Sequence, residues 1–295
     1  MNNKSTTLQS KFTKSICLIS IIMACFISSI YKKILVTPTS QVERLLSAIP
    51  LEIFLLIIIL MIGYKIGFKN VSLSLPKWKK LYWMIPEVLL ILTILTTIEK
   101  PISQPSNFII GKLLLLAILV GIYEELLSRG IILHILSRFG GVKRALIFSG
   151  LIFGLLHFSN FDGSNGVDTF QQILETAAAG IYAGVLTLTL RSLIPLIFTH
   201  IFFDFFQFVS MYFNDLNQTT VVNSVSPSLF DISCYILPLL YLLVALVVFM
   251  FERKNITEYV QELKSKSAEI VVTNFEFYLN ILAIVISIIT IHQFF

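Results

Sequence analysis

The stretch GIYEELLSRG, residues 121–130, carries two adjacent carboxylates and an arginine at the end of a largely apolar run that begins at Phe108. An ionised side chain near the centre of a bilayer costs at least about 2.5 kcal/mol, even on the more lenient scales. The presence of Glu124, Glu125 and Arg129 at the end of this run therefore indicates a role for them, either as a structural ion pair or in chemistry. The rest of the sequence has to decide between these two interpretations.

The composition around this stretch is that of a membrane protein. Of the 295 residues, 56% are hydrophobic and only 13% are charged, and the mean hydropathy is +0.86. A soluble domain carries about 25% charged residues, and no polar stretch here is long enough to fold as a separate domain. We therefore predict one all-α, polytopic transmembrane helix bundle of about nine spans. The expected spans are residues 15–31, 51–68, 81–98, 107–127, 144–158, 171–190, 193–213, 230–251 and 275–295.

Most of the 22 lysines and arginines fall in loops on one side of this arrangement, and the net charge is +5. Basic residues mark cytoplasmic loops, so we expect a multi-pass protein of the plasma membrane with a cytoplasmic amino terminus and a carboxyl terminus outside. No basic cluster with interleaved aromatic residues suggests nucleic-acid binding. The three cysteines, Cys17, Cys25 and Cys234, lie in apolar segments without metal or disulfide spacing.

The first of three polar constellations is Glu124-Glu125-x-x-x-Arg129. On a helix Glu125 and Arg129 are one turn apart with the acid first, which is the favourable order for an ion pair. Glu124 lies about 100° around the helix and has no such partner in the sequence. One interpretation is a set of helix-end charges at the cytoplasmic interface. The other makes Glu124 a general base in an apolar site, with the Glu125–Arg129 pair as its brace.

The other two constellations are Phe153-x-x-x-His157 and His200-x-x-x-Asp204. Residues four apart share a helix face, and a carboxylate one turn from an imidazole can set its tautomer, as around catalytic and metal-bound histidines. Each has a plain alternative, namely a membrane histidine hydrogen-bonded to a neighbour or a polar clasp between helices. Together the three constellations put six polar side chains on three separate spans, which favours a functional site.

Other ionisable residues in the apolar segments stand alone, and we interpret them as helix-end or interfacial groups. They are Glu87, Lys112, Glu175, Asp231 and Glu276, together with His134 and His292. Glu175 is the best candidate among them for a further role. Residues 252–269 alternate charged and apolar side chains, which predicts a solvated or interfacial helix.

The ordered set of these three constellations resembles the motifs of the CAAX protease and bacteriocin-processing family of intramembrane proteases. That family includes CAAX prenyl endoproteases and bacterial bacteriocin-immunity (Abi) proteins. The resemblance covers residues 121–204. It implies a four-helix catalytic core within residues 107–213, with N-terminal transmembrane helices over residues 1–106 and C-terminal transmembrane helices over residues 214–295.

Carried over by position, the resemblance implies that Glu124 activates the attacking water with help from His157. Glu125 and Arg129 would shape the site, and His200 with its neighbour one turn on would stabilise the oxyanion or orient the water. For this mechanism we expect the bundle to bring Glu124 and His157 within contact range.

Asp204 departs from the prenyl endoproteases, which carry asparagine at this position. An ionised aspartate donates no hydrogen bond, so orienting His200 or binding a metal suits it better than an oxyanion role. A divalent metal stays open: two histidines and a carboxylate would match zinc with water as the fourth ligand, whereas a Glu/His-activated water needs no metal. The His-Glu-x-x-His pattern is absent, because Ile135 follows His134.

These observations predict an intramembrane endopeptidase that hydrolyses membrane-associated peptides or proteins, with membrane lipid and a peptide or protein substrate as its partners. No serine or cysteine sits in a nucleophile–base arrangement, which argues against an acyl-enzyme. Bacteriocin or pheromone processing, self-immunity and CAAX-type proteolysis are the activities that the resemblance implies. The alternative is a non-catalytic membrane binding, immunity or scaffold protein that uses the same polar core.

Overall fold

The computed structural model describes residues 40–66, 73–139, 141–160, 166–217 and 230–265. These residues form helices with short connections and no strand, which confirms the all-α class. The helices are α2 (Gln41–Ser47), α3 (Ile49–Ile66), η2 (Trp78–Met84), α4 (Ile85–Thr97), α5 (Asn107–Glu125), the π-helical η3 (Leu126–Ile132), α6 (Leu133–Phe139), α7 (Val142–Leu156), η4 (His157–Asn160), α8 (Gly166–Leu190), α9 (Ile194–Asn217) and α10 (Phe230–Ser265).

Within the described ranges, five helices are long and apolar enough to cross a membrane. They are Val42–Met61, Trp78–Thr97, Thr169–Leu190, Ile194–Asn217 and Ile236–Leu263. The predicted spans 107–127 and 144–158 are helical but are not among these five, and the predicted spans 15–31 and 275–295 lie outside the described residues. The membrane helix bundle is therefore confirmed, whereas the number of nine spans is not.

Two predicted boundaries differ from the structure. The helix with the double glutamate extends beyond residue 127, the expected end of its span, and continues through η3 and α6 to Phe139, with every residue of η3 buried. The alternating stretch that begins at residue 252 is not a separate helix either. It continues α10 without a break to Ser265.

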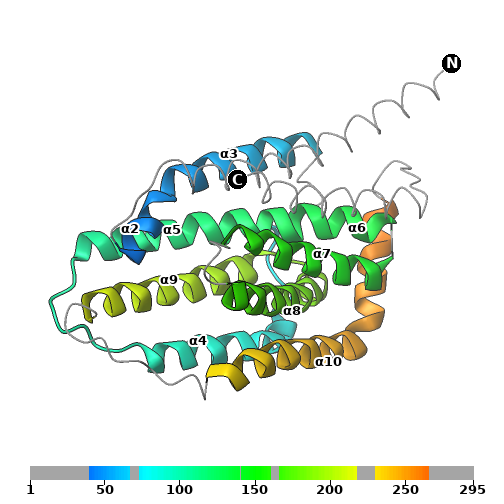
Figure 1. Cartoon of the computed structure of the whole chain (residues 1–295). Coiled ribbons are helices and arrows are strands. Elements are labelled where there is room, and N and C mark those ends of the chain that lie inside the picture. The colour runs from blue at the N-terminus through cyan, green and yellow to red at the C-terminus, as the bar shows by residue number, and fades with distance from the viewer. Residues whose placement is uncertain (1–39, 67–72, 140, 161–165, 218–229, 266–295) are drawn as a thin grey trace.

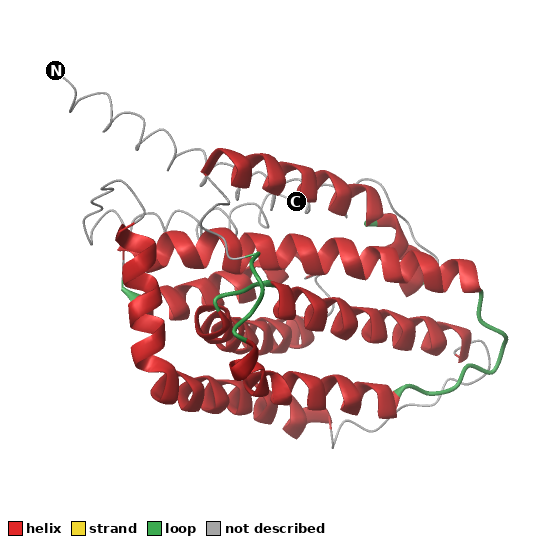
Figure 2. Cartoon of the chain, turned by 180° about the vertical axis from the view of Figure 1, so that it is seen from behind, coloured by secondary structure: helices red, strands yellow, loops and turns green. Residues whose placement is uncertain are grey.

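The helices are stacked side by side in the order α3, α5, α9 and α4 (Figure 1), and each packs against the next. Seen from behind, the stack keeps the same order (Figure 2). The central helix α8 crosses this stack and packs against α7 and α10. In the most apolar stretch of α8, 67% of the residues are buried, whereas in the other four candidate spans the buried share is 22% or less. Because α8 is enclosed on most sides, it is the support on which the surrounding helices are placed.

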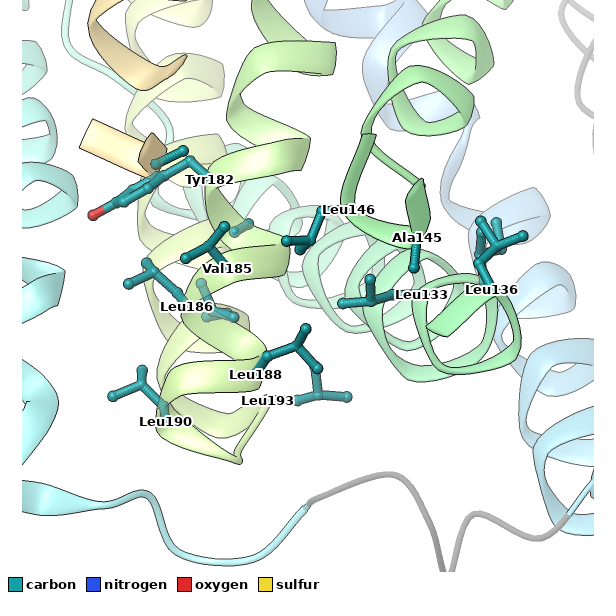
Figure 3. Close-up of a cluster of buried hydrophobic side chains, with 14 of the residues drawn as sticks. Leu133, Leu136, Ala145, Leu146, Tyr182, Val185, Leu186, Leu188, Leu190 and Leu193 are labelled. Carbon is teal, nitrogen blue, oxygen red and sulfur yellow. The ribbon is translucent and has the colours of Figure 1, made fainter. Parts of the chain in front are cut away.

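The largest buried cluster gathers around the second half of α8 (Figure 3). Leu186, Leu188 and Leu190 are fully buried, and Leu133 from α6 and Leu146 from α7 reach the same cluster. Close packing of such branched side chains in low-strain rotamers holds helices at defined distances. The cluster therefore fixes α6 and α7, the helices that follow the double glutamate, against α8.

Glycines let α7 and α8 approach with backbone against backbone. A Cβ atom added at Gly154 would lie 2.5 Å from the carbonyl oxygen of Ile173, and one at Gly150 would lie 2.8 Å from that of Ala177. Small residues at such crossings allow the close helix packing that is common in membranes. The helix that carries Phe153 is thereby held tightly on α8.

A set of polar contacts, which we call the bracket, joins the end of α8 to η2 and α10. Arg191 ends α8 with a left-handed backbone (φ 55°), and its Nη1 atom donates to both carboxylate oxygens of Glu262 at 2.9 and 3.0 Å. Lys80 forms a salt bridge with Glu252, and Trp83 Nε1 donates to the same carboxylate at 3.2 Å. The bracket thus holds η2, and with it the start of α4, against the central helices.

Candidate functional site

The double glutamate closes α5, and the chain continues as the π-helical η3. Every residue of η3 is buried, including Arg129 at 4% exposure. Single π-helical turns inside α-helices are found frequently at functional sites. The Nδ1–H group of His134 donates to the carbonyl oxygen of Arg129 at 2.6 Å, so His134 is a buried group that supports this turn and not the interfacial group predicted from sequence.

Glu125 is the most heavily bonded carboxylate of the site. Its Oε1 atom accepts hydrogen bonds from Nη1 of Arg129 at 2.7 Å and from Nδ1 of His200 at 2.9 Å. The side chains of Glu125 and Arg129 are 3% and 4% exposed. The predicted Glu125–Arg129 pair is therefore present, and the structure adds a bond to α9 that no local spacing could predict.

The other nitrogen of His200 faces two further carboxylates. Its Nε2 atom lies 3.7 Å from Oε2 of Glu124 and 3.5 Å from Oδ2 of Asp204. Both distances suit ion pairs but are too long for strong hydrogen bonds. The side chain of Glu124 is 22% exposed, and those of His200 and Asp204 are 16% exposed. This side of the imidazole is thus the more accessible one.

Phe153 connects the second constellation to the other two. The guanidinium carbon of Arg129 lies 4.2 Å from the centre of the Phe153 ring, a cation–π contact. The rings of His157 and His200 approach the same ring edge-on, with centroids at 5.0 and 6.4 Å. All three predicted motifs therefore meet around one aromatic ring.

His157 belongs to this group through the ring and not through a bond to Glu124. Its Nδ1–H group donates to the carbonyl oxygen of Phe153 at 3.0 Å, which in the neutral ring leaves Nε2 as an acceptor. Among the described residues, no hydrogen bond or ion pair joins His157 to Glu124. The accessible carboxylate is instead paired with His200.

The approach of α5 to α9 depends on Gly121. A Cβ atom at this position would lie 2.8 Å from Cγ1 and 3.1 Å from the backbone nitrogen of Ile201. Such distances are shorter than ordinary van der Waals contact, so only glycine lets the two helices come this close. Because Ile201 follows His200 directly, Gly121 sets how near the histidine comes to the two glutamates.

Glu87 on α4 was predicted as a helix-end or interfacial group, and the structure places it beside the site. It lies close enough to His200, Glu125 and Arg129 to interact with them electrostatically. The sequence provided little indication that Glu87 belongs with the site, because no charged or polar partner lies one turn away on its own helix. Only the packing of α4 on α9 brings it here.

The described residues do not form a ready metal site. No group of three or more His, Cys, Asp or Glu side chains in the described ranges is arranged to hold a metal ion. His200 has one ring nitrogen engaged with Glu125, and the Nδ1 atom of His157 is engaged with its own helix. These positions do not fit the zinc arrangement considered from sequence, so no step below is routed through a metal.

Comparison with protein families matches residues 106–206 to the family described as Type II CAAX prenyl endopeptidase Rce1-like. The matched segment contains all three motifs and confirms the resemblance that they indicated. No curated protein and no solved structure gave a significant match. At the level of the family, the match supports a peptidase embedded in a membrane.

Proposed function

We propose that this protein is an intramembrane endopeptidase in which Glu124 activates water for attack on a peptide bond. The observation that carries the proposal is the accessible carboxylate of Glu124 at 3.7 Å from Nε2 of His200, beside a buried Glu125 whose Oε1 atom is bonded to both Arg129 and His200. The two adjacent glutamates thus differ in exposure and in their hydrogen-bond partners. One is available to a water molecule, whereas the other holds the site together.

In this proposal the attacking water binds from the accessible side of the pair, against Oε2 of Glu124 and Nε2 of His200. The side chains of both residues are partly exposed, so this side is open to such a water. In the proposed step the Glu124 carboxylate takes a proton as the water oxygen attacks the substrate carbonyl carbon. The same proton then passes to the amine nitrogen as the carbon–nitrogen bond breaks, so no covalent enzyme intermediate forms.

His200 is the residue that orients this water. Its Nδ1–H donates to Glu125, which fixes the plane of the ring and directs Nε2 toward Glu124 and Asp204. Asp204 lies one helical turn from His200 and holds the Nε2 side of the ring. An ionised carboxylate donates no hydrogen bond, so orienting this ring suits Asp204 better than stabilising an oxyanion. His157, across the Phe153 ring, is placed to assist at the substrate, and Arg129 secures Glu125.

The proposed substrates are membrane-associated peptides or proteins. The Rce1-like match supports CAAX-type proteolysis as one form of this activity, and processing of bacteriocin or pheromone precursors or self-immunity is another. The proposal includes the plasma membrane as the location, with the amino terminus in the cytoplasm and the carboxyl terminus outside.

The experiment uses the purified full-length protein in proteoliposomes with a set of membrane-associated precursor peptides. Products are identified by mass spectrometry, with and without a strong zinc chelator. We expect cleavage by the wild type, loss of cleavage in Glu124→Gln and in His200→Ala, and retained cleavage in Glu99→Gln, which removes an exposed carboxylate far from the site.

Cleavage that survives in Glu124→Gln and His200→Ala contradicts the proposal. If a cellular immunity phenotype also survives in both variants, the non-catalytic binding or scaffold role predicts this result and the peptidase does not. Loss of wild-type cleavage with chelator would overturn the metal-free route but keep the peptidase.

A further inference from the structure

His134 is a buried histidine outside the three motifs, and its side chain is bonded to the backbone of the turn that follows the double glutamate. It is 3% exposed, and its Nδ1 atom lies 2.6 Å from the carbonyl oxygen of Arg129. A carbonyl oxygen only accepts hydrogen bonds, so this nitrogen carries the hydrogen. Ionisable side chains inside membrane proteins are rare and mark functional positions, and this one is joined directly to a residue of the site.

The bond from His134 replaces a missing backbone bond at the end of η3. In an α-helix the amide of Leu133 would donate to the carbonyl oxygen of Arg129, four residues earlier. Here this amide donates to the carbonyl oxygen of Ser128, five residues earlier, as in a π-helix. The carbonyl oxygen of Arg129 therefore lacks the donor that an α-helix would provide, and the imidazole supplies one. His134 thus favours the π-helical register at this point of the chain.

The π-helical register sets the direction in which Arg129 presents its side chain. Because a π-helical turn closes one residue later than an α-helical turn, a return to the α-helical register would rotate Arg129 about the helix axis. In the structure Arg129 donates to Oε1 of Glu125 at 2.7 Å and lies over the Phe153 ring at 4.2 Å. Both contacts depend on this direction. His134 is therefore linked to the polar cluster through the backbone of Arg129.

The link continues from Arg129 to the side of the cluster that faces the water in the proposed reaction. Oε1 of Glu125 also accepts a hydrogen bond from Nδ1 of His200 at 2.9 Å, and Nε2 of the same ring faces Glu124 at 3.7 Å. A carboxylate oxygen shared by two donors holds both of them, so a displaced Arg129 would move His200 relative to Glu124. Three successive hydrogen bonds thus join His134 to His200.

The helix that carries His134 is itself held firmly. Leu133 and Leu136, its neighbours on α6, belong to the largest buried cluster (Figure 3), and α6 packs against α7. The hydroxyl of Ser137 donates to the carbonyl oxygen of His134 at 2.9 Å. The imidazole is therefore a donor at a fixed place, against which the π-helical turn is positioned.

We propose that His134 is a positioning residue of the peptidase, whose side-chain bond to Arg129 keeps the π-helical turn in register and thereby sets the distance between His200 and Glu124. The inference rests on the proposed peptidase function and adds to it a residue outside the three motifs. In this assignment His134 contacts neither the water nor the substrate and acts through Arg129 and Glu125.

Three substitutions of His134 separate its hydrogen bond from its volume. Asparagine places an N–H donor where Nδ1 lies, glutamine places one where Nε2 lies, and leucine offers none. In proteoliposomes we expect His134→Leu and His134→Gln to lower kcat about a hundredfold, the effect of a misplacement of about 1 Å, with KM nearly unchanged. His134→Asn should regain most of the wild-type kcat.

Thr187→Val is the matched control for these variants. It removes another buried bond from a side chain to a backbone carbonyl, the 2.9 Å bond from Thr187 to Ala183 within α8, and should leave kcat at the wild-type value. A second measurement needs no hydrolysis. The Nδ1–H resonance of His200, in protein labelled at histidine nitrogen and held in nanodiscs, should shift in His134→Leu and His134→Gln and return in His134→Asn.

Wild-type kcat in His134→Leu, or equal kcat in His134→Asn and His134→Gln, overturns the positioning role and leaves the peptidase proposal intact. Lower thermal stability with wild-type kcat also overturns it, because His134 would then be structural only. If His134→Leu does not fold, the comparison of asparagine with glutamine decides. If the wild type cleaves no peptide, the peptidase proposal fails and the His200 resonance decides alone: an unshifted signal in His134→Gln contradicts the positioning role, and a shift reversed in His134→Asn supports it.

Discussion

The imidazole of His200 and the carboxylate of Glu125, 75 residues apart in the chain, meet through a 2.9 Å hydrogen bond between Nδ1 and Oε1. The same oxygen accepts a hydrogen bond from Arg129 at 2.7 Å. One carboxylate oxygen therefore joins α9 to the turn that follows α5. The bond also decides which nitrogen of His200 is left to face Glu124.

The two adjacent glutamates should respond oppositely to substitution. Glu125→Ala leaves Arg129 buried without its anion, and breaking such a buried pair costs about 3–5 kcal/mol of the free energy of unfolding. Glu124→Gln should change this free energy by less than about 1 kcal/mol, because the residue is partly exposed and keeps its volume, yet it should abolish hydrolysis. Unfolding in mild detergent, followed by circular dichroism, measures the first effect, and peptide cleavage measures the second. Equal destabilisation by both variants would contradict this division of roles.

Gly121→Ala should separate α5 from α9. The new Cβ atom would lie 2.8 Å from Cγ1 of Ile201, and overpacking of this kind costs about 1–3 kcal/mol. Moving His200 by about 1 Å relative to Glu124 should lower kcat by about a hundredfold. Gly111→Ala on the same helix is the matched control, because a Cβ atom there meets nothing within 4 Å. Equal activity of the two variants would show that this approach does not position the site.

Phe153→Leu should loosen the contacts of Arg129, His157 and His200 together. The variant removes the ring under the guanidinium group and should lower the free energy of unfolding by about 1–3 kcal/mol. The imidazole resonances of both histidines should shift in NMR spectra of selectively labelled protein. Phe198→Leu is the control on α9, since that side chain is 57% exposed. Unshifted histidine resonances would rule out Phe153 as the connection between the motifs.

Two substitutions of Arg191 should separate the contribution of its side chain from that of its backbone. Arg191→Ala and Arg191→Gly both remove the contact with Glu262, but only glycine adopts the left-handed backbone (φ 55°) without strain. Arg191→Ala should therefore be less stable than Arg191→Gly by about 1–2 kcal/mol. Thermal unfolding of the two variants in the same detergent gives the comparison. Alanine at or above the stability of glycine would mean that the turn after α8 rearranges.

The sequence alone was sufficient for the features that depend on local spacing. Long apolar runs predict membrane helices, because the backbone in a bilayer must satisfy its own hydrogen bonds. The spacing of Glu125 and Arg129 predicts their ion pair, because one helical turn brings such residues together. The order of the three motifs identified the family segment, and comparison with protein families matches the same region.

The tertiary structure decided which partners those residues have on other helices. Nothing in the local sequence indicates that Glu125 bonds His200 or that Phe153 joins Arg129 to His157. Such pairings depend on which helix faces meet, and here the missing side chain of Gly121 and the burial of α8 determine that. The sequence by itself thus determined a membrane helix bundle with a polar cluster. Helix packing, through close approach that only small residues permit, decided how the cluster is divided between a buried brace and an accessible carboxylate.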